Sequence, residues 1–415
     1  MLYKIKAVDQ LFFRSPAPFE AGGGSQFLAS YFPPLPSTYA GAFRMFPREL
    51  TEGDKAKRLR IGYNGLLYQG ALCFPQPLDL LRISESDGEE EMPFNVINKH
   101  YALEKLIIEK KPPSNFPLDY YLVRDKLEDN GENDEEEGKK SFPEDLYISE
   151  QRLKAYLNAE NTPISGFSLS DNLTKEAKLG IEIGTDGIAE DGMLYQIEMI
   201  RPKDEDGNDW ELAVEASGIK MDDKKSYVRL GGEAKVAQIE DMEQAFKLEI
   251  ADSESKFFKL YFATPAIFQN GWLPRWIKKD MTGSFSYKGK KVKVELLAAA
   301  VGKSMPIGGF GNFVVKDPDK KADHKARPRE LRYAIPAGSV YYFKILEGDF
   351  EKVKKLFHQR CISDYREDSN SKGEEPYGFS RPMKIFDRLI YCDRGFGYAF
   401  VGAVTRFSKE ALLNV

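Results

Sequence analysis

The chain has 415 residues, enough for two or three domains, and 42% of them are hydrophobic, which supplies ordinary cores. Its formal net charge of −5 at pH 7 argues against nucleic-acid binding only if the charge is spread evenly. It is not, because residues 269–344 hold 16 Lys and Arg against 6 Asp and Glu. This part of the chain is therefore strongly basic within an acidic protein.

The cysteines and the apolar pattern argue against zinc-binding, secreted and membrane-spanning classes of protein. Cys73, Cys361 and Cys392 are odd in number, far apart and outside any C-x-x-C pair, so we expect reduced thiols and no structural zinc. Residues 1–6 alternate like a strand and lack the apolar core of a signal peptide, and no run approaches eighteen apolar residues. We expect a cytoplasmic protein that is neither secreted nor membrane-spanning.

The first elements are a strand and a helix. Residues 2–8 alternate as a half-buried strand does. After a proline-rich approach, Ser37 or Thr38 is placed to cap a helix. A free helix N-terminus beside Arg14 and Arg44 would suit a phosphate. In the alternative, the helix only packs and both arginines face solvent.

The middle of the chain changes from apolar to acidic. Residues 65–81 predict a strand, and the charged segments 85–91 and 128–140 have nothing apolar to bury. We expect a surface insertion at about 84–145 and no bound metal, because carboxylates on a loose loop lack fixed geometry. Residues 146–159 then predict a helix.

Strands dominate the following segment. Apolar, strand-like runs cover residues 179–184, 193–201, 210–217 and 227–236. The Asp-Gly pairs at 186–187, 191–192 and 206–207 indicate turns at hairpin spacing. In the second half, residues 257–265 and 291–301 predict further strands. Between them, Trp272 and Trp276 lie beside cations and either stack on a nucleobase or belong to the core.

A glycine cluster at residues 306–312 leads into a basic segment. Glycine permits positive φ and close approach of another chain, and it leaves backbone N–H groups free to face an anion. The segment up to Arg332 carries eight basic residues, His324 included, which a folded interior cannot bury. A plain turn followed by a solvated loop is the alternative. Together the two features favour an anionic, extended partner.

The last elements are a strand at 339–346, an amphipathic helix at 349–359 and a strand at 394–404. The order of strands and helices predicts an α+β fold with antiparallel sheets and charged loop insertions. We expect two domains, residues 1–245 with the acidic insertion and residues 246–415 with the glycine-rich loop.

Several motifs occur in a consistent order: Asp9 to Arg14 with its Phe-Phe-Arg, residues 33–44, Arg-Leu-Gly-Gly-Glu at 229–233, Ala-Thr-Pro-Ala at 263–266 with Gly-Trp-Leu-Pro at 271–274, residues 306–311, 335–343 and 395–402. With them the sequence resembles the RAMP superfamily of CRISPR-associated proteins, and most closely the third subunit of the type III-B Cmr effector complex. Residues 84–172 match nothing specific.

The resemblance implies two ferredoxin-like (RRM-like) domains and no catalytic activity. It implies an RNA-binding structural subunit that helps to hold the 5′ tag of the CRISPR RNA in antiviral defence. It also implies docking to the large polymerase/cyclase-like subunit and to the backbone RAMP subunit. Because base pairing selects sequence in RNA-guided machines, the protein needs to grip only backbone and ends. We expect no cofactor.

Carried onto this chain, Gly308, Gly309 and Gly311 would form the G-rich loop of the superfamily. The candidates for phosphate and tag contacts are chosen for their chemistry: Arg14, Ser37, Arg44, Lys303, Arg327, Arg329 and Arg332.

The nearest alternative is a metal-independent, CRISPR RNA-processing endoribonuclease of the same superfamily, in which a histidine can move protons from a 2′-hydroxyl. His324 is the candidate, although a basic loop is a poor platform for a general base. His100 has no cluster around it, and we expect His358 on a helix surface. A nucleotide-binding enzyme is a weaker alternative, because the glycines match neither G-x-x-x-x-G-K-[ST] nor G-x-G-x-x-G. A general RNA-binding protein unrelated to CRISPR is a further alternative, which neither composition nor periodicity excludes.

Overall fold

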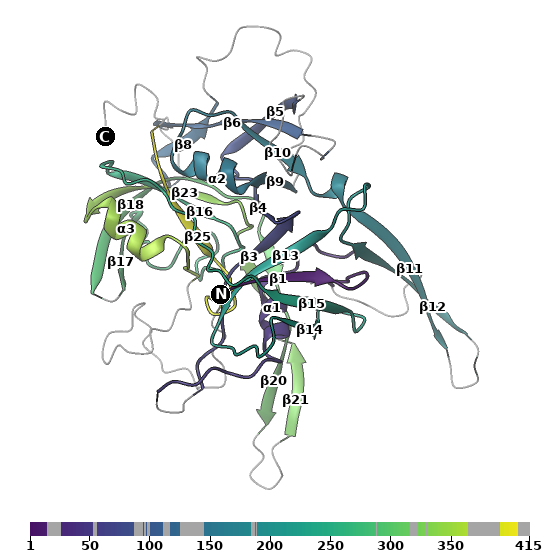
Figure 1. Ribbon diagram of the computed structural model, residues 1–415. Helices are drawn as coiled ribbons and strands as arrows, with labels where there is room; N and C mark the ends of the chain where they lie inside the picture. The colour runs from purple at the N-terminus through teal and green to yellow at the C-terminus, as the bar shows by residue number, and fades with distance from the viewer. Residues whose placement is uncertain are drawn as a thin grey trace.

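The computed structural model describes residues 1–14, 26–52, 56–86, 94, 97, 100–110, 117–124, 145–183, 187, 189–287, 289–315, 323–328, 331–363 and 391–405. Its largest element is a ten-stranded sheet (Figure 1). In spatial order the strands are β14 (Lys225–Arg229), β15 (Val236–Asp241), β1 (Leu2–Ala7), β13 (Trp210–Ser217), β3 (Arg60–Tyr68), β4 (Ala71–Pro75), β9 (Leu146–Ser149), β10 (Ile164–Ser168), β6 (His100–Lys105) and β5 (Leu80–Ser86).

A six-stranded sheet is built from the second half of the chain. Its order is β17 (Thr282–Tyr287), β18 (Lys290–Ala300), β23 (Val340–Glu347), β16 (Phe257–Phe262), β25 (Tyr398–Ala403) and β24 (Arg360–Cys361). Helix α3 (Phe350–Phe357) packs on this sheet, and the Asp349 side chain caps it by accepting from the Lys352 N–H at 2.8 Å. Its buried residues at helical spacing confirm the predicted amphipathic helix.

Smaller pairs complete the structure. The three-stranded sheet β11 (Thr174–Ile183), β12 (Ala189–Arg201) and β2 (Gln26–Leu28) contains the one parallel strand pair in the described part of the chain. Two-stranded pairs are β7 (Ile107–Lys110) with β8 (Tyr120–Val123), β19 (Met305–Ile307) with β22 (Arg332–Ala334), and β20 (Phe310–Val315) with β21 (Asp323–Pro328). The predicted α+β class with mainly antiparallel sheets is confirmed. No helix of the described residues has the length and hydropathy needed to cross a bilayer.

The two large sheets share one core. Ring contacts join Phe74 to Phe400 at 5.8 Å and Tyr63 to Tyr398 at 5.9 Å between centroids. Helix α2 (Glu150–Leu157) lies between the sheets, contacting β4 and β9 on one side and β25 on the other (Figure 1). The segment predicted as an insertion also contributes, because Tyr101 of β6 is buried in this core. The acidic residues 128–140 lie outside the described residues.

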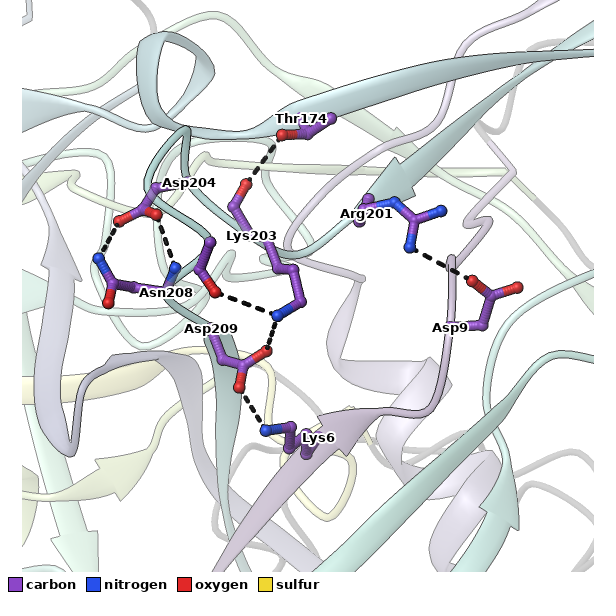
Figure 2. A network of polar contacts seen from close by, with 9 residues as sticks. Lys6, Asp9, Thr174, Arg201, Lys203, Asp204, Asn208 and Asp209 are labelled. Atoms are coloured by element: carbon purple, nitrogen blue, oxygen red, sulfur yellow. Dashed lines mark hydrogen bonds and ion pairs between the residues drawn. The ribbon is translucent and has the colours of Figure 1, made fainter.

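Hairpin β11–β12 extends away from the ten-stranded sheet, and polar contacts hold its base (Figure 2). Asp209 pairs with Lys6 of β1 and, at 3.3 Å, with Lys203 just after β12. Arg201, at the end of β12, pairs with Asp9 at 3.6 Å. Exposed ion pairs of this kind add little stability individually. Their consequence is geometric, because they fix where the hairpin leaves the sheet.

Three of the sequence predictions for the large sheets and hairpin β11–β12 placed element boundaries wrongly. Residues 65–81 were expected to form one strand, but a turn at Gly70 (φ +87°) separates β3 from β4. Residues 146–159 start as β9, and Ser149 then caps α2 by accepting from the Arg152 N–H at 3.2 Å. The expected turn at 191–192 lies inside β12. In each case neighbouring strands decided the boundary, and they outweighed local propensity.

Candidate nucleic-acid interface

A cavity of about 380 Å³ opens on the surface beside helix α1 (Pro36–Phe43). It is formed by Phe13 and Arg14, the residues leading into α1, one face of α1, and the end of β14 with the turn that follows it. Its lining residues are Phe13, Arg14, Tyr31, Leu35, Thr38, Gly41, Ala42, Arg229, Gly231 and Gly232. Among these described residues two are cationic and none is acidic. The electrostatics of the cavity therefore suit an anion.

Proline geometry sets the start of α1. Pro36 occupies the first turn, where a missing N–H costs nothing, and Leu35 is the N-cap in an extended conformation. The prediction that Ser37 or Thr38 caps the helix is wrong, because no side chain hydrogen-bonds to this N-terminus. Thr38 instead lies on the helix face that lines the cavity, which contains neither Ser37 nor Arg44. Arg44 is the exposed C-cap residue.

The turn after β14 brings an arginine to the cavity. The predicted strand 227–236 is in fact two strands, because this turn separates β14 from β15. Gly231 has φ +83°, and a Cβ on it would lie 2.4 Å from the Phe12 carbonyl oxygen, so only glycine fits this close approach. The Gly232 N–H donates to the same oxygen at 2.8 Å. This packing places the exposed Arg229 near Arg14 in the cavity lining.

The acidic residue of this turn, Glu233, pairs with a lysine outside the cavity lining. Glu233 pairs with Lys178 of β11 at 2.8 Å, and this hydrogen bond raises the pKa of Lys178. Glu233 is not among the residues that line the cavity. Its charge is therefore partly compensated and does not oppose an anion there.

Two basic candidates of the second half lie on strands, Arg327 on β21 and Arg332 on β22, and Lys303 lies two residues before β19. Ile307 of β19 is paired with Arg332, and Gly311 of β20 is paired with Arg327. Lys303, Gly308 and Gly309 are exposed, so the glycine cluster is not sealed in a core. Gly309 has φ +139°, and no heavy atom lies within 4 Å of a Cβ built on it. Arg329 and the Arg327 side chain lie outside the described residues.

The two candidate regions are adjacent, although 274 residues separate them. Tyr31, which lines the cavity, places its hydroxyl 3.7 Å from the Met305 sulfur. Leu35 of the cavity and Met305 pack against one cluster that includes Ile307 and Ala334. The cavity and β19 are therefore neighbours in the structure, and in Figure 1 hairpin β20–β21 extends from the body below α1 and β14.

The candidate tryptophans and two of the three histidines pack within the protein. Trp276 is 9% exposed and stacks on Phe343, so the core interpretation is correct for it, while Trp272 is partly buried against Tyr341. His100 is buried, with Nε2 3.0 Å from the Phe94 carbonyl oxygen.

His358 was expected on a helix surface, and this is wrong. Its Nε2 lies 2.7 Å from the Leu248 carbonyl oxygen, and its Nδ1 accepts from the Val401 N–H at 3.2 Å. Burial lowers its pKa. His324 lies on β21, and its side chain is outside the described residues. Within the described part of the chain, no three His, Cys, Asp or Glu side chains are grouped to hold a metal ion.

The model of the family described as CRISPR-associated protein (Cas_Cmr3) matches residues 3–380. The chain belongs to the Cas_Cmr3 family. Two similar solved chains come from cryo-EM structures of the type III-B Cmr-beta complex bound to cognate target RNA, one of them also with AMPPnP. They are 15% and 16% identical to this Cas_Cmr3 chain, cover 82% of it and 86% of their own length, and have TM-scores of 0.41. No curated protein matches the sequence.

Sequence reasoning missed three cavity residues of this Cas_Cmr3 protein as contact candidates, namely Tyr31, Thr38 and Arg229. The signal for Arg229 is its position before a Gly-Gly pair in one of the motifs of the resemblance. For Tyr31 there is no local signal, because its importance comes from its contact with Met305. The predicted resemblance to a CRISPR-associated Cmr protein is confirmed by the match to the Cas_Cmr3 family.

Proposed function

We propose that this Cas_Cmr3 protein is a non-catalytic subunit of a type III-B Cmr complex and helps to hold the 5′ tag of the CRISPR RNA. The observation that carries the proposal is the Tyr31–Met305 contact. It joins a cavity with two arginines to the exposed glycines and basic strands of residues 303–332. The two arginines of the cavity, with Lys303 and Arg332 near β19, supply positive charge that suits a strand of phosphates.

The same proposal includes finer assignments. The chain would be a RAMP superfamily protein and the third subunit of its complex, with two ferredoxin-like domains that meet near residue 245. It would dock to the large polymerase/cyclase-like subunit and to the backbone RAMP subunit. Identifying the proteins and RNA that co-purify with the native protein tests these partners directly.

Salt dependence tests the RNA contact. Each phosphate contact contributes about 0.7 to the slope of log affinity against log salt for a single strand. The double variant Arg327→Ala/Arg329→Ala is therefore expected to weaken binding of tag-bearing RNA and to lower the slope by about 1.4 in filter-binding titrations. The control Lys352→Ala/Lys355→Ala removes the same charge from the exposed surface of α3. Equal slopes for the first variant and the wild type would remove these arginines from the site.

The endoribonuclease alternative depends on His324, because the rings of His100 and His358 contact backbone atoms. Incubation of the protein with precursor CRISPR RNA, with magnesium or with a chelator, is expected to give no specific product. Specific cleavage that disappears in His324→Ala would replace our proposal with the enzyme.

A further inference from the structure

The cavity beside α1 has two chemically distinct parts. Arg14, Thr38 and Arg229 supply cations and a hydroxyl, whereas Phe13, Leu35 and Ala42 supply apolar wall. Tyr31, a residue that is 39% exposed, adds an aromatic ring. Its volume of about 380 Å³ lies in the ordinary range for a site that encloses one small ligand. A ligand that matches this lining carries both an anionic and a planar apolar group.

A glycine on α1 keeps the cavity open. Thr38, Gly41 and Ala42 are spaced by three and four residues, so they share one helix face. Gly41 is exposed, and a Cβ built on it meets no heavy atom within 4 Å. Glycine is a poor residue inside a helix, so local helix stability does not explain its presence. Its lack of a side chain instead leaves the backbone of α1 accessible to a ligand.

We propose that this cavity holds one nucleotide of the bound RNA, with its phosphate at Arg14 and Arg229 and its nucleobase against Tyr31. Guanidinium groups match the geometry of phosphate oxygens, and bases of single strands stack on aromatic rings. The inference rests on the proposed RNA-binding function and adds a defined position to it. The proposed occupant is a nucleotide that belongs to the RNA strand. A free mononucleotide in the cavity would be a different result.

The first test fills the cavity without disturbing the core. Gly41→Leu adds a side chain at the open cavity wall, and leucine favours helix formation, so we expect a folded protein with an unchanged or higher melting temperature. Its affinity for single-stranded RNA with the repeat-derived 5′ tag is expected to fall about 10- to 100-fold, which is the range for a lost base-stacking contact. The control Gly41→Ala adds one methyl group and is expected to change affinity less.

The second test locates the nucleotide. Tag RNAs with a single abasic position, moved along the strand, are expected to show one position with a clear loss of affinity for the wild-type protein. In Gly41→Leu the same abasic change is expected to cost nothing further, because the base has already been displaced. If Gly41→Leu only damaged the structure, it would lower the affinity for every RNA equally. The abasic change at the sensitive RNA position would then still lower the affinity of the variant.

The outcomes separate this inference from the function it rests on. If the wild-type protein, assembled with the subunits that co-purify with it, does not bind the tag RNA, the proposed function fails. If it binds the tag RNA and neither Gly41→Leu nor any abasic position changes the affinity, only the proposal that the cavity holds a nucleotide is refuted. Competition by free AMP or UMP, without any sensitive abasic position, would also refute it and assign the cavity to a mononucleotide.

Discussion

Asp79→Ala is expected to lower the free energy of unfolding by about 2–6 kcal/mol, from about 1–3 kcal/mol for each buried hydroxyl left without its acceptor, one of the two largest effects that we predict. Asp79 is 1% exposed and lies where the two large sheets meet. Its carboxylate accepts hydrogen bonds from the hydroxyl of Tyr156 on α2, at 2.8 Å, and from that of Tyr342 on β23. Alanine would leave both hydroxyls buried without this acceptor, and the desolvation cost would be uncompensated.

Asp79→Asn is the matched control for this prediction. The amide has nearly the same shape and keeps one oxygen acceptor, so we expect a smaller loss than for alanine. Urea denaturation of the three proteins at one pH measures the difference. A loss below about 1 kcal/mol for Asp79→Ala would show that the network does not hold the sheets together.

Lys259→Met is expected to remove a strong pH dependence of stability. Lys259 of β16 is 6% exposed, and its Nζ lies 3.3 Å from the centroid of the Tyr156 ring. Burial lowers its pKa from 10.5 to about 7, although the nearby Asp79 opposes this shift and Lys105 adds to it. Other titratable groups of this cluster are the hydroxyls of Tyr156, Tyr261 and Tyr342, whose pKa values burial raises.

The sign of the effect follows from proton uptake. Between about pH 7 and 10.5 the unfolded chain holds the Lys259 proton and the folded chain does not, so stability rises with pH in this window. From pH 7 to 9 the wild type should gain about 2 kcal/mol from this group, whereas Lys259→Met should gain nothing from it. Measurements stop at pH 9 because tyrosines of the unfolded chain titrate near pH 10.

Urea denaturation at pH 7, 8 and 9 provides this comparison. Lys105→Met is the control, because it removes a neighbouring positive charge that is not fully buried. We expect it to preserve most of the pH slope of the wild type. Parallel curves for the wild type and Lys259→Met would show that Lys259 keeps its proton on folding.

Local patterns were sufficient to predict several elements. Alternation predicted β1, the apolar run at 257–265 predicted β16, and helical spacing predicted α3. The exposure of Gly308 and Gly309 also agrees with the predicted pliable loop, whereas the role of the basic segment that follows stays a prediction. These features depend on residues close together in sequence, where periodicity reflects which side faces the core.

Features that depend on distant segments were not predictable in this way. Asp79 is an ordinary loop residue in the sequence, and its partners are 77 and 263 positions away. The contact between Tyr31 and Met305 joins two candidate regions that the sequence treats separately. Trp276 looks the same in sequence whether it stacks on a base or fills a core. Only the packing of segments that lie far apart in the sequence decides these cases.

Strand β1 has a consequence for biosynthesis. It lies between β13 and β15, with Leu2 opposite Glu215 and Tyr3 opposite Asp241. The ribosome must therefore synthesise the chain from β1 to Asp241 before β1 has both neighbours. At about 5–20 residues per second this delay is roughly 10–50 s. During it, β1 is exposed to chaperones and proteases, so impaired chaperone capacity should reduce the yield of this protein more than its final stability would indicate.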